Sequence, residues 1–194
     1  MILPIVAYGD PVLRKIGKEI DADYPDLSKL IADMKETMYN AQGVGIAAPQ
    51  IGRDIRLFII DATPFAEDED VSEEERKVLE GFDKVFINAK ILNQEGEEWA
   101  FNEGCLSIPD IREDVFRQKT ITIEYQDENF KKYSETLTGL AARIFQHEYD
   151  HIEGVLFTDK LSSLKKRLIK KKLESISKGK IDPGYRMRFP NAKK

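Results

Sequence analysis

The chain has 194 residues, of which 41% are hydrophobic and 34% charged, and its formal net charge is −5 at pH 7. This balance excludes an intrinsically disordered chain and predicts a soluble, globular, single-domain protein with a buried core. The sequence has neither an apolar run of about 20 residues, as a membrane span requires, nor the features of a secretory signal. A single cysteine, Cys105, excludes an internal disulfide, so we expect a cytoplasmic protein.

The first part of the chain predicts one helix and one strand around a glycine-rich segment. Apolar residues recur at helical spacing over 26–41, where the opening aspartate is the expected N-cap and Gly43 the expected stop. The glycine-rich segment 43–52 follows, and residues 55–61 have the composition of a strand. Residues 62–82 contain two acidic runs and predict an exposed insertion between strands.

The second part predicts short strands and two helices. Residues 84–92, 120–125 and 131–137 are rich in the β-branched and aromatic side chains that strands prefer. Residues 140–153 and 161–176 predict helices. One face of the second helix is expected to carry Leu161, Leu164, Leu168 and Ile169. The fold class is therefore α+β, with mostly antiparallel strands around a central helix and a C-terminal helix.

Charge is distributed unevenly along the chain. Residues 160–194 contain 13 Lys and Arg residues but only two acids, whereas the remainder is acidic. We therefore divide the chain into a body at 1–160 and a basic C-terminal helix and tail at 161–194. Two interpretations of the basic segment stay open: a solvated helix face followed by a tail, or a contact with an anionic surface such as RNA.

Three scarce residues form the clearest chemical pattern. The only two histidines lie in an H-E-Y-D-H motif, and at about 100° per helical residue His147 and His151 share one face with Glu148. An H-E-x-x-H helix of this kind binds a metal ion and supplies a carboxylate base. Glu153 is too near on the same helix to complete a tetrahedron, so Cys105 is the better third ligand. Taken alone, this cysteine is more typical of a small buried hydrophobe than of a metal ligand.

Three segments resemble, in order, the signature motifs of the peptide deformylase family. They are Gly-Val-Gly-Ile-Ala-Ala-Pro-Gln at 43–50, Glu-Gly-Cys-Leu-Ser-Ile-Pro at 103–109 and Gln-His-Glu-Tyr-Asp-His-Ile-Glu-Gly at 146–154. The resemblance extends from about residue 2 to 170. It implies that residues 1–160 form a catalytic domain that removes the N-formyl group from the initiator methionine of nascent polypeptides and releases formate.

The resemblance also implies the roles of individual residues. Glu148 would be the general base and acid, which accepts a proton from metal-bound water and returns it to the departing amine. The side-chain amide of Gln50 and the backbone N–H of Leu106 would stabilise the oxyanion. The ligands would be Cys105, His147 and His151. Such a set suits several divalent ions, and the resemblance implies Fe²⁺, with Zn²⁺, Ni²⁺ or Co²⁺ as substitutes.

Substrate contacts are expected along the glycine-rich segment. Glycines allow a close approach of backbone, so an extended peptide would pair with residues 43–46 as an added strand. A plain core role is an equally good interpretation of the apolar positions. The residues expected to contact the substrate are Gly43, Val44, Gly45, Ile46, Leu140 and Ile144. Behind the cysteine, Glu103 is expected to pair with Arg112 or Arg117, and Asp150 is an alternative partner for a ligand imidazole.

Two other functions fit parts of the pattern. A general metallopeptidase shares water activation on H-E-x-x-H, although all three segments resemble a deformylase. An RNA- or ribosome-binding module with a structural metal would explain the basic segment, although structural sites normally have four ligands. An enzyme that acts on nascent chains could also dock weakly at the ribosome through residues 160–194. We expect no contact with membrane or DNA.

Overall fold

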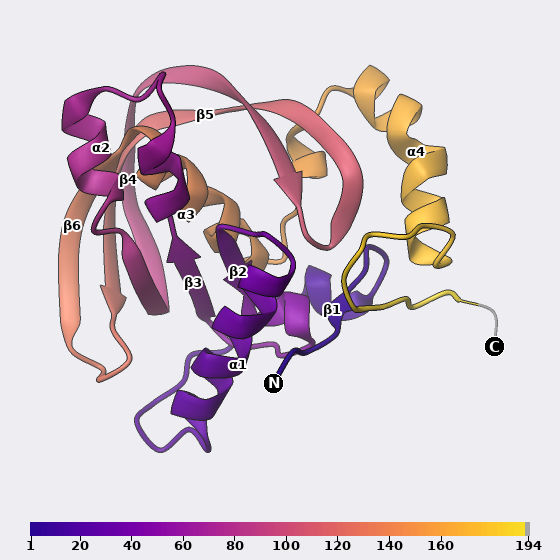
Figure 1. Ribbon diagram of the computed structural model, residues 1–194, viewed down its shortest axis with the longest axis horizontal. Helices are drawn as coiled ribbons and strands as arrows, with labels where there is room; N and C mark the ends of the chain where they lie inside the picture. The colour runs from indigo at the N-terminus through magenta and orange to yellow at the C-terminus, as the bar shows by residue number, and fades with distance from the viewer. Residues whose placement is uncertain (193–194) are drawn as a thin grey trace.

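The computed structural model describes residues 1–192 and is built around one antiparallel sheet (Figure 1). The strand order is β2-β3-β4-β5-β6, so β2 and β6 form the two edges. These strands are β2 (Gly45–Ala47), β3 (Leu57–Asp61), β4 (Asp83–Cys105), β5 (Ile108–Gln126) and β6 (Lys132–Thr138). A separate pair of short parallel strands consists of β1 (Ile5–Val6) and β7 (Met187–Arg188). The predicted α+β class is confirmed.

The remaining elements cover the sheet and connect its strands. Figure 1 shows α3 in the middle of the molecule, with the long arch of β5 above it. The α-helices are α1 (Leu27–Asn40), α2 (Glu73–Leu79), α3 (Gly139–Ile152) and α4 (Ser163–Ser177). Short 3₁₀ helices are η1 (Pro11–Arg14), η2 (Ala48–Ile51), η3 (Thr63–Glu67) and η4 (Phe157–Lys160). Within residues 1–192, none of the helices has both the length and the apolar character needed to cross a bilayer.

Both predicted α-helices that precede residue 160 are confirmed, but the N-cap expected for the first helix is not formed, and neither helix has a side-chain cap at its start. Asp26 precedes α1 in a left-handed conformation (φ 54°) and does not cap the helix through its side chain. Thr138 precedes α3 without a side-chain capping bond either. Instead, the carboxylate of Glu75 accepts a hydrogen bond of 2.7 Å from the backbone N–H of Leu140. An acidic group at this end of a helix is stabilised by the free N–H groups and the helix dipole.

The prediction that residues 62–82 form an exposed insertion is wrong in part. The acidic side chains are mostly exposed, but the segment forms η3 and α2 and contributes Ala66, Leu79 and Phe82 to the main apolar core. The acidic runs dominate the composition of the segment, so the sequence interpretation overlooked these few apolar positions. Gly139 allows the insertion to approach α3, because a Cβ at this position would collide with the carboxylate of Glu75. The insertion is therefore packed against the helix that carries the histidines.

The strands β4 and β5 extend well beyond the predicted 84–92 and 120–125. Their middle parts form a twisted ribbon in which residues 92–98 are exposed. Register shifts interrupt the ribbon, including one between Glu95 and Glu98. A strand that is solvated on both faces lacks the alternation of apolar and polar residues on which a sequence prediction depends. The ribbon ends at Cys105, so its length determines where the thiol lies.

The expected apolar face of the C-terminal helix is wrong in part. Leu161 and Ile169 are buried, but Leu164 and Leu168 are 60% and 72% exposed. Leu161 precedes the helix, which begins at Ser163, so a stripe traced from it has the wrong phase. The buried face of α4 instead consists of Ile169, Leu173 and Ile176. These residues pack in an apolar cluster with residues of the N-terminal segment and β5. Residues 193–194 of the basic segment lie outside the described residues.

Candidate metal centre

The fold brings the three scarce residues together. Cys105 ends β4, while His147 and His151 lie one turn apart on α3. Their ligand atoms all lie within 4.8 Å of one another, and Cys105 Sγ is 3.3 Å from His151 Nε2. Sulfur and nitrogen atoms that share a tetrahedral ion at about 2.0–2.3 Å lie roughly 3.5 Å apart. The cluster could therefore hold one metal ion.

The buried carboxylate of Glu103 orients the first imidazole. Glu103 Oε2 lies 2.9 Å from His147 Nδ1, which leaves Nε2 of the ring for the metal cluster. The expected pairing with Arg117 is confirmed by bonds of 2.7 and 2.9 Å, and Arg143 adds another of 2.9 Å. Arg112 instead donates to Asn102. Burial opposes the charged carboxylate, but the hydrogen bonds from Arg117 and His147 hold the pKa of Glu103 well below its usual value.

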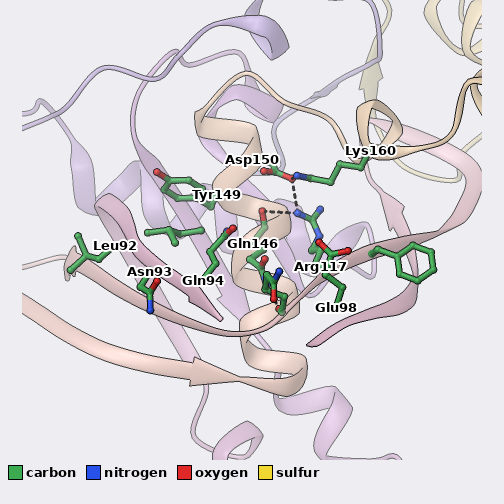
Figure 2. A pocket seen from close by; sticks show the side chains of 12 residues that line it. Leu92, Asn93, Gln94, Glu98, Arg117, Gln146, Tyr149, Asp150 and Lys160 are labelled. Carbon is green, nitrogen blue, oxygen red and sulfur yellow. Dashed lines mark hydrogen bonds and ion pairs between the residues drawn. The ribbon is translucent and has the colours of Figure 1, made fainter. Parts of the chain in front are cut away.

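A chain of ion pairs continues from this carboxylate to the surface. Arg117 Nη1 donates to Asp150 Oδ2 at 2.7 Å, and Lys160 Nζ lies 3.4 Å from the same oxygen. Figure 2 shows these three side chains in one polar pocket beside Gln146. Asp150 was the alternative candidate for direct contact with a ligand imidazole, but it contacts Arg117 instead. Asp150 holds the arginine that holds Glu103.

The two histidines differ in their electrostatic environment. Burial disfavours a charged His147, but hydrogen bonds with Cys105 and Glu103 raise the pKa of this imidazole well above its usual value. Burial and the neighbouring His147 lower the pKa of His151 well below its usual value. A divalent ion held by a thiolate and two neutral imidazoles fits this donor set.

Glu148 lies beside the same cluster with its side chain almost enclosed. It is 4% exposed, and its Oε2 atom has no hydrogen-bond partner among the described residues. A Cβ at Gly45 would collide with its carboxylate, so β2 approaches this group more closely than another residue type permits. Burial raises the pKa of Glu148 to about 7, with His147 opposing the shift. A carboxyl group with such a pKa can accept and return a proton near neutral pH.

Of the two predicted oxyanion donors, the side-chain amide of Gln50 lies beside the thiol. The backbone N–H of Ala47 donates to Gln50 Oε1 at 2.8 Å, which turns the amide nitrogen of Gln50 toward the thiol. That nitrogen lies 3.5 Å from Cys105 Sγ and 3.4 Å from Ser107 Oγ. Leu106 follows the cysteine in the turn between β4 and β5. Gln50 and Leu106 both line the cavity beside the cluster.

This cavity has a volume of about 530 Å³ and contains most of the predicted site residues. The expected substrate residues that line it are Gly43, Val44, Gly45 and Ile144. Ile46 and Leu140 do not line it. Leu140 is buried in the main apolar core, and Ile46 is buried in a second apolar cluster. The sequence interpretation missed Phe65 from the acidic insertion, Phe101, and Pro183 and Tyr185 from the C-terminal tail. None of these four belongs to a motif segment, so only the folded chain reveals them.

The sequence model of the polypeptide deformylase family matches residues 2–167. This range includes the whole cluster and every residue that lines the cavity except Pro183 and Tyr185. The chain belongs to this family. A peptide deformylase of Christiangramia forsetii is 69% identical over 194 residues, which are 100% of this chain and 99% of the relative. A peptide deformylase of Flavobacterium johnsoniae is 66% identical with the same coverage. The chain is therefore an enzyme of the hydrolase class.

Solved structures of the family have the same fold. The crystal structure of a peptide deformylase from Legionella pneumophila is similar with a TM-score of 0.76 and 37% identity, over 93% of this chain and 98% of the other. A peptide deformylase from Thermotoga maritima is similar with a TM-score of 0.70 and 39% identity, over 84% and 99% of the two chains. The antiparallel sheet around a central helix is thus the family architecture.

The close contact between β2 and Glu148 gives a direct test. Replacement of Gly45 by Ala places a methyl group against the carboxylate, which must move. A displacement of about 1 Å in a catalytic group can cost about 100-fold in rate. We expect deformylase kcat to fall by at least about tenfold with unchanged metal content. Gly81→Ala is the control, because its Cβ meets no atom within 4 Å. Equal kcat for both variants would contradict the role of this contact.

Proposed function

We propose that this chain removes the N-formyl group from the initiator methionine of nascent polypeptides and releases formate. The observation that carries the proposal is the meeting of three kinds of group at one cavity. A thiol and two imidazoles converge on one point, a buried carboxyl group lies beside them, and the side-chain amide of Gln50 lies next to the thiol. Hydrolysis of a formamide requires this combination of an activated water, a proton carrier and a stabilised oxyanion.

The proposed ligands of the metal ion are Cys105, His147 and His151, with Fe²⁺ as the native ion and Zn²⁺, Ni²⁺ or Co²⁺ as substitutes. The ion would supply Lewis acidity, which makes water a nucleophile near neutral pH. Three protein ligands leave a coordination position for chemistry, as catalytic sites require. Glu103 fixes the ring of His147 through Nδ1. The coordinating nitrogen is therefore set by the protein before any substrate arrives.

Glu148 is the proposed general base and acid. Its carboxylate accepts a proton from the attacking water while the oxygen of that water bonds to the formyl carbon. It then gives the proton to the amine nitrogen as the C–N bond breaks, which yields formate and a free amino group. The raised pKa of Glu148, at about 7, suits both steps. Its position on α3, directly after His147, supports this role.

The amide of Gln50 and the backbone N–H of Leu106 are the proposed oxyanion donors. Attack on the formyl carbon transfers negative charge to the formyl oxygen, and a donor that is already oriented stabilises this charge by about 3–4 kcal/mol. The bond from Ala47 to Oε1 of Gln50 provides this orientation for the side-chain amide. The turn that contains Leu106 provides it for the backbone donor.

Peptide substrates would bind along β2. This strand is an edge of the sheet, so the backbone groups of residues 43–46 that do not bond to α1 or β3 could pair with an extended peptide. The cavity next to it offers Val44, Ile144, Phe65 and Phe101 to the methionine side chain. Leu140 would support this wall from the core. A formyl-methionyl peptide would thus lie with its formyl group at the metal and its chain along the strand.

The basic C-terminal segment is proposed to dock weakly at the ribosome in the cytoplasm. Several Lys and Arg residues of α4 are exposed, and this charge would attract ribosomal RNA in a salt-dependent manner. No membrane or DNA contact is proposed. Because α4 also packs in the core through Ile169, Leu173 and Ile176, deletion of the segment would disturb the fold. Charge reversal is the cleaner test.

Ribosome binding can be tested with a triple reversal of exposed residues on α4, Arg167→Glu, Lys170→Glu and Lys171→Glu. We expect at least about tenfold weaker cosedimentation with ribosomes at low salt, and a smaller salt dependence for the variant. Reversal of three exposed basic residues of the body, Arg53, Lys77 and Lys132, is the matched control. Equal binding by the two triple variants would contradict a specific role of α4.

The deformylase reaction is tested with two substrates and one variant. We expect rapid release of formate from formyl-Met-Ala and no cleavage of an unformylated tripeptide. Efficient cleavage of the tripeptide would instead indicate a general metallopeptidase. Glu148→Gln keeps the size of the side chain but cannot accept the proton, so kcat should fall about 10²–10⁴-fold while the metal content per chain is unchanged. Full activity of this variant would contradict the role of Glu148 as general base and acid.

A further inference from the structure

The C-terminal tail returns to the catalytic cavity after α4. The parallel pairing of β1 with β7 anchors it, with the N–H of Ile5 and of Ala7 donating at 2.9 Å to the carbonyls of Arg186 and Arg188. In Figure 1 this segment is the yellow part of the chain beside β1. The anchored pair positions the residues just before it, and Pro183 and Tyr185 line the cavity as a result.

Tyr185 makes one specific polar contact at this site. Its hydroxyl donates a hydrogen bond of 2.8 Å to the carbonyl oxygen of Leu106, which is 79 residues away in the chain. Leu106 and Ser107 form the two-residue turn between β4 and β5, because Cys105 pairs directly with Ile108. The other carbonyl of the turn, at Ser107, accepts from the backbone N–H of Tyr8 at 2.9 Å. Both carbonyls of the turn therefore accept hydrogen bonds from segments near the two ends of the chain, one from Tyr8 and one from Tyr185.

The turn has a demanding geometric task if the proposed function is correct. Its first residue follows the thiolate ligand and supplies the N–H for the oxyanion. Only two backbone dihedral angles of Leu106 separate that N–H from the carbonyl that Tyr185 holds, so fixing the carbonyl restricts the direction of the N–H. Oxyanion stabilisation depends on donors that are already oriented before reaction.

We propose that Tyr185 is a positioning residue for deformylation, an inference that rests on the proposed function. Its hydroxyl fixes the turn that contains Leu106 and directly follows Cys105. Its ring, with Pro183, forms a wall of the cavity and contacts the substrate there. The tail is thus part of the catalytic site, in addition to any role of the basic segment in docking.

The test compares Tyr185→Phe and Tyr185→Ala with Tyr24→Phe in metal-loaded protein. Tyr24 packs on the same apolar cluster as Tyr185 but lines a different pocket. The measurements are kcat and KM for formyl-Met-Ala, metal per chain, and amide hydrogen exchange of residues 105–108. For Tyr185→Phe we expect kcat to fall about five- to tenfold, KM to stay within about twofold, and exchange in 105–108 to accelerate at least about fivefold. For Tyr185→Ala we expect KM to rise as well.

Three results would overturn the proposal in whole or in part. Wild-type kcat and wild-type exchange of residues 105–108 in Tyr185→Phe would refute the positioning role. Faster exchange throughout the chain with unchanged kcat per folded molecule would leave only a structural role. An unchanged KM in Tyr185→Ala would refute the substrate wall. If the unaltered protein fails to release formate, the proposed function fails, while the exchange of 105–108 still reports whether Tyr185 holds the turn.

Discussion

The carboxylate of Glu103 is the interaction on which the site depends. It is only 5% exposed, and it accepts hydrogen bonds from Arg117 and Arg143 and contacts His147. A buried carboxylate costs several kcal/mol unless cations surround it, and loss of one partner typically costs about 3–5 kcal/mol. These partners lie on β5 and α3, whereas Glu103 lies on β4. The charge of Glu103 therefore connects β4, which carries Cys105, to α3, which carries both histidines.

The same network orders the chemistry. Glu103 sets the ring of His147, and Arg117, which balances its charge, is held in turn by Asp150, which also pairs with Lys160. On the opposite side, β2 fits closely against Glu148 through Gly45. The ligand cluster and the carboxyl group thus have fixed relative positions before a substrate binds. Such preorganisation is what makes electrostatic stabilisation effective.

Local sequence patterns predicted much of the fold and of the site. The features that they did not predict depend on packing between segments that are distant in the sequence. Helical spacing placed both histidines and Glu148 on one face, and glycine-rich sequence marked β2 as a surface for close approach. Neither pattern could reveal that Phe65 and Tyr185 reach the cavity, because those contacts arise only when distant segments pack. The middle of the β4–β5 ribbon was missed because solvation on both faces removes its periodicity. The face of α4 was misplaced because Leu161 lies before the helix, not in it.

The most direct test of this account is the metal affinity of Glu103→Gln, measured by competition with a chelator. The amide keeps the shape of the side chain but removes the charge that orients His147 and balances the arginines. Partners of this kind typically contribute about 10- to 100-fold to metal affinity. We predict a loss of this size for Glu103→Gln and none for Glu97→Gln, an exposed residue of the same strand. Equal metal affinity and equal activity of both variants would contradict the central role of Glu103.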